Sequence, residues 1–261
     1  MEISVASGPA CTCCSDPFPA TAVPEAGAGR EAMLCRACRM APPDFERAVA
    51  YGPYEDRMRA AIHALKYDRM YPAARRMGAM LASAIAKLAA DAPKEMLVVP
   101  VPLHRMKYAE RGFNQARVLA MHALRALRHS HPAWKLTLAP STLMRLRATE
   151  SQAGLTPRQR RMNVRGAFQV SDGAAVEGRN ILLVDDILTT GATARAASRA
   201  LKRAGAATVW VATLARAGKV EFHASRIPAD EAAKNKPNGE VAPDEPGQPR
   251  TAEPSAQSNF S

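Results

Sequence analysis

The chain has 261 residues, of which 47% are hydrophobic and only 5% are aromatic. This length allows one α/β domain of ordinary size with small additions, and aliphatic side chains must fill most of its core. The sequence contains no apolar run near the ~20 residues that a transmembrane helix needs. The N-terminus also lacks the basic and apolar regions of a secretory signal, so we expect a cytoplasmic protein.

The formal net charge is +12 at pH 7. The segment from residue 218 onward contains 5 basic and 7 acidic residues, which leaves 31 basic and 17 acidic residues, or +14, in residues 1–217. This balance favours an anionic partner, either a polyphosphate substrate or a nucleic acid. A basic surface that serves only solubility is the alternative.

All five cysteines lie within the first 38 residues. Cys11 with Cys14, and Cys35 with Cys38, form two C-x-x-C pairs separated by 20 residues, a spacing that predicts a structural four-cysteine zinc site. The residues between the pairs include few large apolar side chains, so metal would supply their folding energy. Cys13 is left over, although it could replace a neighbour as ligand. Disulfides are the alternative, which a reducing compartment disfavours.

The next segment predicts two helices and a strand. Residues 51–67 indicate a helix after the break at Gly52 and Pro53, and residues 73–90 indicate a second one. Residues 96–101 form an apolar run that predicts a parallel strand, which ends at two prolines, Pro100 and Pro102.

A basic loop follows that strand, and a helix begins near Ala116. The loop contains His104, Arg105, Lys107 and Arg111. Because ligands of doubly wound sheets bind at the carboxyl ends of strands, we expect this loop to contact phosphate. Residues 134–138 then indicate a short strand.

Residues 145–165 contain six arginines and one acidic residue, Glu150. We interpret them as a long basic loop or hairpin, with alternation returning at residues 167–170. Its functional interpretation is a mobile lid that closes over pyrophosphate. A solvated surface loop is the alternative.

Residues 180–193, NILLVDDILTTGAT, predict a strand, a polar turn and the start of a helix. Residues 181–184 suit a strand buried on both faces, and Asp185 and Asp186 are expected at its end. Unpaired N–H groups at a helix start hold phosphate, and carboxylates can bind ribose hydroxyls or approach magnesium. The pattern therefore indicates a ribose 5-phosphate site.

A Walker B strand and a simple capped helix are the alternatives for this stretch. A Walker B strand would require an upstream G-x-x-x-x-G-K-[ST] motif, which the sequence does not contain. Simple helix capping would need only one of these polar residues. Beyond the turn, we expect a helix over residues 194–204, a buried strand over 208–214, and a disordered tail from residue 218.

Several of these stretches together resemble the ComF family, whose members are phosphoribosyltransferase-like proteins associated with competence. They are the cysteine pairs, YGPYEDRMRAAIHALKY, the run containing RGFNQ, the arginine-rich segment and LLVDDILTTGAT. The resemblance implies an α/β fold of the type I phosphoribosyltransferase kind, with a parallel sheet flanked by helices. It also implies a zinc-binding region over residues 1–45, the transferase-like domain over 46–217, and a disordered tail over 218–261.

The resemblance further implies binding of magnesium and phosphoribosyl pyrophosphate (PRPP), and transfer of the phosphoribosyl group to an acceptor that the sequence does not identify. Asp185 and Asp186 would contact the ribose hydroxyls and, with Arg111, serve catalysis. The implied PRPP-binding residues are further Thr189, Thr190, Gly191, Ala192, Thr193, Pro102 and Arg105. The implied hood loop contains Arg145, Arg147, Gln152 and Arg161.

A second hypothesis is a non-catalytic module that handles single-stranded DNA during natural transformation, together with the competence machinery and with PRPP as a regulatory ligand. The low aromatic content counts against it, because single-strand binding usually relies on stacking platforms. A regulatory protein that senses PRPP without turnover is a third possibility.

Overall fold

The computed structural model of the chain describes residues 8–19, 33–67, 71–147, 159, 164 and 166–218, with backbone alone at residues 71 and 72. The tail beyond residue 218 and most of the arginine-rich segment lie outside these residues. Within the part described, none of the helices combines the length and the apolar character needed to cross a bilayer.

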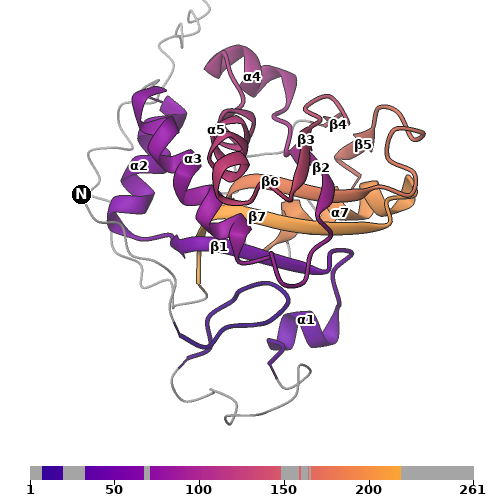
Figure 1. Cartoon of the computed structure of the whole chain (residues 1–261), viewed down its shortest axis with the longest axis horizontal. Coiled ribbons are helices and arrows are strands. Elements are labelled where there is room, and N and C mark those ends of the chain that lie inside the picture. Colours follow the sequence, from indigo (N-terminus) through magenta and orange to yellow (C-terminus); the bar gives the residue numbers. More distant parts are fainter. Residues whose placement is uncertain are drawn as a thin grey trace, which may run out of the picture. The chain divides into compact units, whose positions relative to one another are not determined.

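Five parallel strands form the central sheet, in the spatial order β1-β7-β6-β2-β3 (Figure 1). They are β1 (Arg47–Pro53), β2 (Glu95–Pro100), β3 (Lys135–Leu138), β6 (Asn180–Leu188) and β7 (Thr208–Arg216). The runs at 181–184 and 209–212 are almost completely buried, because β6 and β7 are covered on both faces. The predicted α/β class is confirmed.

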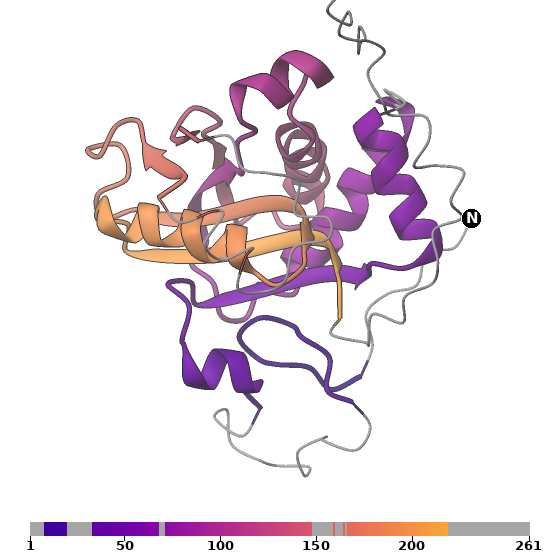
Figure 2. The same ribbon diagram turned by 180° about the vertical axis from the view of Figure 1, so that it is seen from behind.

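Helices cover both faces of this sheet. α2 (Asp56–Tyr67), α3 (Tyr71–Ala86) and α5 (Gln115–Ser130) pack on one face (Figure 1). α7 (Ala192–Arg203) packs on the other face (Figure 2), near a two-stranded antiparallel sheet of β4 (Leu143–Arg145) and β5 (Phe168–Val170). Within residues 181–184 of β6, Leu182 and Val184 face the first layer and Ile181 and Leu183 face the second, as strand alternation requires.

The chain changes direction in the sheet between β2 and β6. β2 continues through α5 to β3, whereas β6 continues through α7 to β7, so the two helices leave toward opposite faces. The pairing of β2 with β6 ends at Pro100 and Val184, but β6 runs on beside β7 as far as Leu188. In open α/β sheets a ligand crevice forms where neighbouring connections diverge in this way.

The N-terminal segments, including α1 (Arg36–Met40), lie beside β1 (Figures 1 and 2). The carbonyl oxygen of Cys13 accepts from the N–H of Ala48 at 2.7 Å, and Ser15 Oγ donates to the Ala48 carbonyl at 2.7 Å. Since β1 is the outermost strand on that side, these bonds occupy part of an otherwise open sheet edge.

Two elements, β1 and a short helix after β2, were missed in the sequence analysis. β1 was not expected, because Gly52 and Pro53 indicated a break before a helix; Pro53 instead ends an edge strand, and α2 begins at Asp56. The basic loop after β2 contains the helix α4 (Arg105–Arg111). The ring of His104 caps α4 by accepting from the N–H of Met106 at 3.4 Å.

The strand predicted over residues 181–184 is also longer than expected. β6 extends to Leu188, so Asp185 and Asp186 lie within it rather than beyond its end. Its neighbour β7 is equally long, and the ladder continues through the pair of Asp185 with Thr213. The basic segment at 145–165 is predicted as a loop or hairpin. Most of it lies outside the described residues, and the residues on either side of it pair as β4 and β5.

Candidate functional site

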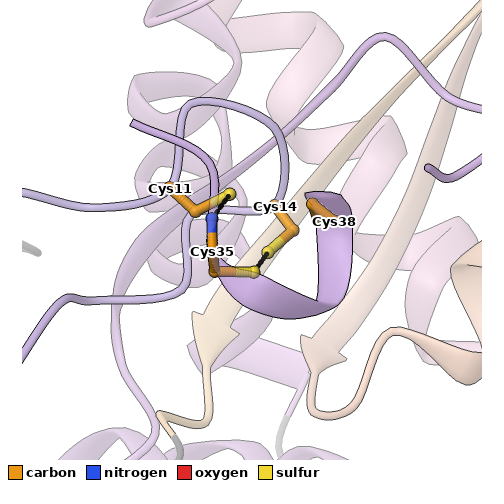
Figure 3. Close-up of side chains that lie close together, drawn as sticks. All are labelled: Cys11, Cys14, Cys35 and Cys38. Atoms are coloured by element: carbon orange, nitrogen blue, oxygen red, sulfur yellow. Dashed lines mark hydrogen bonds between the residues drawn. The ribbon is translucent and has the colours of Figure 1, made fainter. Parts of the chain in front are cut away.

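The four paired cysteines come together in the N-terminal segments (Figure 3). Their sulfur atoms all lie within 4.8 Å of one another, and Cys14 Sγ is 3.7 Å from Cys35 Sγ. Sulfur atoms about 2.3 Å from a central tetrahedral ion would be about 3.8 Å apart. The backbone N–H of Cys35 also donates to Cys11 Sγ at 3.3 Å. The cluster therefore fits a four-coordinate metal ion such as zinc, with Cys13 outside the set.

The cysteine thiols perturb one another. Contact with Cys11 raises the pKa of Cys14 to about 12, while the neighbouring thiols of Cys14 and Cys38 lower the pKa of Cys11. Four thiolates this close would repel strongly, and a divalent cation would relieve that repulsion.

The acidic pair of β6 lies at the crevice between β2 and β6. Strand alternation directs the two side chains away from the backbone on opposite sides, but their carboxyl groups still interact with each other. Asp186 has the parity of Leu182 and Val184, which face α2, α3 and α5. Asp185 has the parity of Leu183, which faces α7 and the antiparallel pair β4–β5. Lys66 acts on both carboxyl groups, through an ion pair with Asp186 and at longer range with Asp185, whereas Arg145 interacts with Asp185.

Asp186 is paired with Lys66, which lies at the end of α2. The Lys66 Nζ atom is 2.6 Å from Asp186 Oδ2, and the two side chains are 19% and 7% exposed. Burial opposes ionisation of both groups, but their attraction outweighs it. The pKa of Asp186 is therefore lowered and that of Lys66 is raised. Asp186 is accordingly a carboxylate at neutral pH.

Asp185 has the opposite environment. Burial and the adjacent charge of Asp186 raise its pKa well above the ordinary value, although its Oδ1 accepts from the N–H of Asp186 at 2.9 Å. Arg145 of β4 interacts with Asp185: burial lowers the pKa of Arg145, and the charge of Asp185 counteracts part of this effect. Among the described residues, Asp185 has no ion pair like the one between Asp186 and Lys66.

Further cations gather beside the acidic pair. Arg111, the last residue of α4, donates to Gln115 Oε1 at 3.2 Å and to the Tyr67 hydroxyl at 3.4 Å, and its guanidinium lies 5.1 Å from the centre of the Tyr67 ring. Burial, Arg111 and Arg145 lower the pKa of Lys107, with a smaller effect from Lys66. Four cations therefore lie in the neighbourhood of the two carboxylates and Glu110, an excess of positive charge suited to a polyanion.

The polar turn follows β6. Gly191 has φ of 74° and precedes the first residue of α7, and the Thr190 hydroxyl accepts from the N–H of Ala192 at 3.4 Å. A methyl group at Gly191 would meet only Leu188 Cδ1, at 3.9 Å, among the described residues. The first turn of α7 contains no acidic side chain. The N–H groups at this helix start can therefore bind an anion.

The RGFNQ run fixes the start of α5 against β2. Gly112 takes the left-handed conformation that ends α4, with φ of 77°. Asn114 caps α5 by accepting from the N–H of Arg117 at 3.3 Å, and its Nδ2 donates to the Val101 carbonyl at 3.0 Å. Phe113 and Gln115 are buried. The run therefore holds Arg111 at the crevice.

Comparison with known proteins agrees with this geometry. Residues 114–238 match the family model of the phosphoribosyl transferase domain. The DNA utilization protein YhgH of Salmonella typhi is 32% identical over 191 residues, which cover 72% of this chain and 80% of that protein. The chain belongs to the ComF family. Competence protein F of Haemophilus influenzae is 28% identical over 189 residues (71% and 80%), and competence protein ComFC of Bacillus subtilis is 32% identical over 164 residues (62% and 61%).

This membership confirms the ComF-family resemblance that the sequence motifs indicated. Of the predicted site residues, the structure brings together Asp185, Asp186, Arg111 and Arg145. Arg105 is exposed at the start of α4 and Pro102 is half-buried before it, while Arg147 is exposed after β4. Gln152 and Arg161 lie outside the described residues. The roles of all these residues stay predictions.

The sequence motifs of this ComF-family chain do not predict Lys66 and Tyr67 as members of the site. They predict Lys107 only as one of several basic residues in a loop that contacts phosphate, and not as a residue of a helix. The only signal was spacing, because Lys107 and Arg111 are four residues apart and share a face once the segment is helical. Nothing local to Lys66 indicates its partner 120 residues away.

Proposed function

We propose that this protein binds PRPP with magnesium in the crevice between β2 and β6 and transfers its phosphoribosyl group to an acceptor, releasing pyrophosphate. The observation that carries this proposal is the buried acidic pair, which lies beside four cations and just before the turn at the N-terminus of α7. A sugar with a phosphate at one end and a pyrophosphate at the other requires this combination of groups.

Each group has a role in the proposed complex. Residues 189–193 hold the 5-phosphate through backbone N–H groups and threonine hydroxyls. Asp185 and Asp186 accept hydrogen bonds from the ribose hydroxyls, and Lys107, Arg111 and Arg145 bind the pyrophosphate. Magnesium, held by ligand oxygens and the acidic pair, would neutralise charge on the pyrophosphate.

The reaction would be a displacement at the anomeric carbon. The bond from this carbon to the pyrophosphate oxygen breaks with its electron pair leaving on oxygen, and a lone pair of the acceptor forms the new bond. The proton of the acceptor passes to solvent or to the departing pyrophosphate. The cations that hold the leaving group stabilise the charge that develops on it. Exclusion of water, which we assign to the hood segment, prevents hydrolysis.

Calorimetric titration with magnesium and PRPP tests this proposal. We expect binding by the wild-type protein and none by the double variant Asp185→Asn, Asp186→Asn, because the ribose hydroxyls and magnesium lose both negative charges. Asp172→Asn is the matched control, since this exposed carboxylate only accepts from the N–H of Ala174. Unchanged binding by the double variant would exclude the acidic pair as the site. If binding depends on the acidic pair, a screen for pyrophosphate release with candidate acceptors would identify the acceptor.

The names of the relatives favour a second candidate function. DNA utilization and competence proteins are related to this chain, and its first 217 residues have a net charge of +14. We infer that the protein acts in DNA uptake in the cytoplasm, where it handles single-stranded DNA and PRPP is a regulatory ligand. Binding of PRPP without pyrophosphate release for any acceptor would favour this function.

A further inference from the structure

Arg216, the last residue of β7, joins the cysteine segment to the turn after β6. Its side chain is 7% exposed. Toward the cysteine segment, Nε donates to the carbonyl of Cys14 at 3.2 Å and Nη2 donates to Asp16 Oδ1 at 2.8 Å. Toward the turn, Nη1 donates to the carbonyls of Leu188, at 2.9 Å, and Thr189. One guanidinium thus holds a metal-ligand loop and the entrance to the phosphate turn together.

Arg195 makes a second connection on the other side of the turn. It lies in the first turn of α7, where its N–H donates to the carbonyl of Gly191 at 2.9 Å. Its guanidinium donates to the carbonyl of Ala41 at 2.6 Å and to Cys38 Sγ at 3.6 Å. The turn is therefore tied to the cysteine segment at both of its ends.

These connections are sensitive to the fold of the cysteine segment. A buried guanidinium requires a partner for each of its N–H groups, and removing some of them leaves donors without acceptors in a dry environment. The segment 8–19 and 33–45 contributes few large apolar side chains, so its conformation depends on the four-cysteine cluster. Loss of the metal would release the acceptors at Cys14 and Asp16 from Arg216.

We propose that the metal-binding segment positions the phosphate turn through Arg216 and Arg195, so that metal occupancy and binding of a phosphoribosyl ligand are energetically coupled. The ligand part of this proposal rests on the proposed function. By linkage the coupling is reciprocal, so a phosphate ligand in the turn also tightens metal binding. Arg216 and Arg195 are positioning residues, since both act on the ligand through the backbone of the turn.

Hydrogen exchange on the full chain tests the connection without any ligand. The N–H groups of Arg195 and Ala217 report on the turn, because they donate to Gly191 and Leu188. The N–H of Ala139, which donates to Val98 at the opposite edge of the sheet, is the reference. After removal of metal with a chelator, we expect at least tenfold faster exchange at the two turn reporters and little change at Ala139. Equal exchange with and without metal would overturn the proposal, as would equal acceleration at all three positions.

Variants test which residue transmits the effect. Arg216→Lys keeps the charge but cannot donate to both segments at once. We expect it to lose metal to a chromogenic chelator about tenfold faster than wild type. Arg199→Lys is the matched control, since Arg199 of α7 also contacts the N-terminal segment, at Asp44 Oδ2 3.0 Å away, but does so at the surface. If Arg216→Lys does not fold, Asp16→Asn takes its place in the metal-release measurement. This variant removes the charge that pairs with Arg216 but keeps a hydrogen-bond acceptor. Metal release at the control rate would contradict the role of Arg216.

Metal retention with and without PRPP completes the test. We expect PRPP to slow metal release from the wild type and to have less effect on Arg216→Lys. A wild type that does not bind PRPP would contradict the proposed function, while the exchange and metal-release results would still decide the connection itself. PRPP binding with no effect on metal release would overturn the coupling and leave the proposed function intact.

Discussion

Asp185 and Asp186 are adjacent in the chain, but their carboxyl groups have opposite electrostatic environments. Lys66 stabilises the charged form of Asp186, whereas burial and the charge of Asp186 disfavour the charged form of Asp185. A buried carboxylate without a close counter-ion lowers the stability of the folded protein. Such a cost is common at sites that bind a cation or a diol, because function retains groups that stability would remove.

The two single variants should therefore change stability in opposite directions. At pH 7.5 we expect Asp186→Asn to lower the free energy of unfolding by up to about 3 kcal/mol, because Lys66 loses its buried partner. Asp185→Asn should raise it by about 0.5–2 kcal/mol, because a buried charge is removed. Urea denaturation of both variants measures this, and a loss of stability in Asp185→Asn would contradict the environment described.

The same two groups give a pH dependence. The pKa of Asp185 is higher in the folded state than in the unfolded state. Asp185 therefore does not lower the folding stability below its ordinary pKa of about 3.9, and it lowers the stability increasingly as the pH rises through its folded-state pKa. The pKa of Asp186 is lower in the folded state, so its stabilisation is present above the ordinary value and is lost as pH falls through the folded one. In denaturation experiments the difference between Asp185→Asn and wild type should shrink between pH 7.5 and pH 4, whereas the difference between Asp186→Asn and wild type should persist to about pH 4 and shrink only below it. Differences independent of pH would argue against both shifts.

Gly191 is the residue at which backbone conformation and ligand space coincide. With φ of 74°, an alanine there is strained even though its methyl group has room. We expect Gly191→Ala to cost about 1 kcal/mol of stability and to weaken PRPP binding at least tenfold. Gly173→Ala is the control, because Gly173 has no positive φ and an added methyl group meets nothing there. Equal effects of the two substitutions would show that the turn tolerates a side chain.

At the scale of the element, α4 matters because it presents two cations together. Lys107 and Arg111 are one helical turn apart, so they share the face that lies toward Arg145 and Lys66. Gly112 and the Asn114 cap then fix where α4 ends and α5 begins. In an irregular loop the two side chains would have no common direction.

Lys107 should therefore contribute to pyrophosphate binding. We expect Lys107→Gln to weaken the affinity for magnesium pyrophosphate about tenfold, because a charged hydrogen bond of about 1.5 kcal/mol is lost. Arg117→Gln removes the same charge from an exposed position in the first turn of α5 and should leave the affinity nearly unchanged. Calorimetry compares the two, and equal losses would indicate that only net charge matters.

The elements differ in how far the sequence predicted them. The strand and turn at 181–193 were predictable because apolar runs and helix-start residues are local signals, and the two C-x-x-C pairs have a recognisable spacing. β1 was missed because Gly52 and Pro53 are breakers except at a sheet edge. The pair of Lys66 with Asp186 and the contacts of Arg216 with Cys14 were beyond prediction, because only the packed fold brings such distant residues together.

At the scale of the whole molecule, the positive charge of residues 1–217 is larger than the cation cluster at the crevice needs. Many arginines lie on exposed surfaces, including Arg36, Arg59, Arg105 and Arg199. A surface of this kind attracts polyanions regardless of sequence and responds strongly to salt.

Binding to single-stranded DNA should show that salt dependence. We expect the logarithm of the affinity for an oligonucleotide to fall linearly with the logarithm of salt concentration, with a slope of about −0.7 for each phosphate neutralised. Fluorescence anisotropy with increasing salt measures this slope. Heparin is the control, and equal affinity for heparin would mean that charge alone attracts the DNA.

The place of β1 in the sheet has a consequence for how the chain folds during synthesis. Val49 and Thr213, 164 residues apart, are joined across the β1–β7 ladder. During synthesis β1 therefore emerges long before its partner β7. Until β7 is made, only the cysteine segment and α3 can bury the apolar side chains of β1. Pairing over such a separation slows folding and leaves an exposed strand for longer. We expect this chain to need chaperones during synthesis more than a helical bundle of the same length.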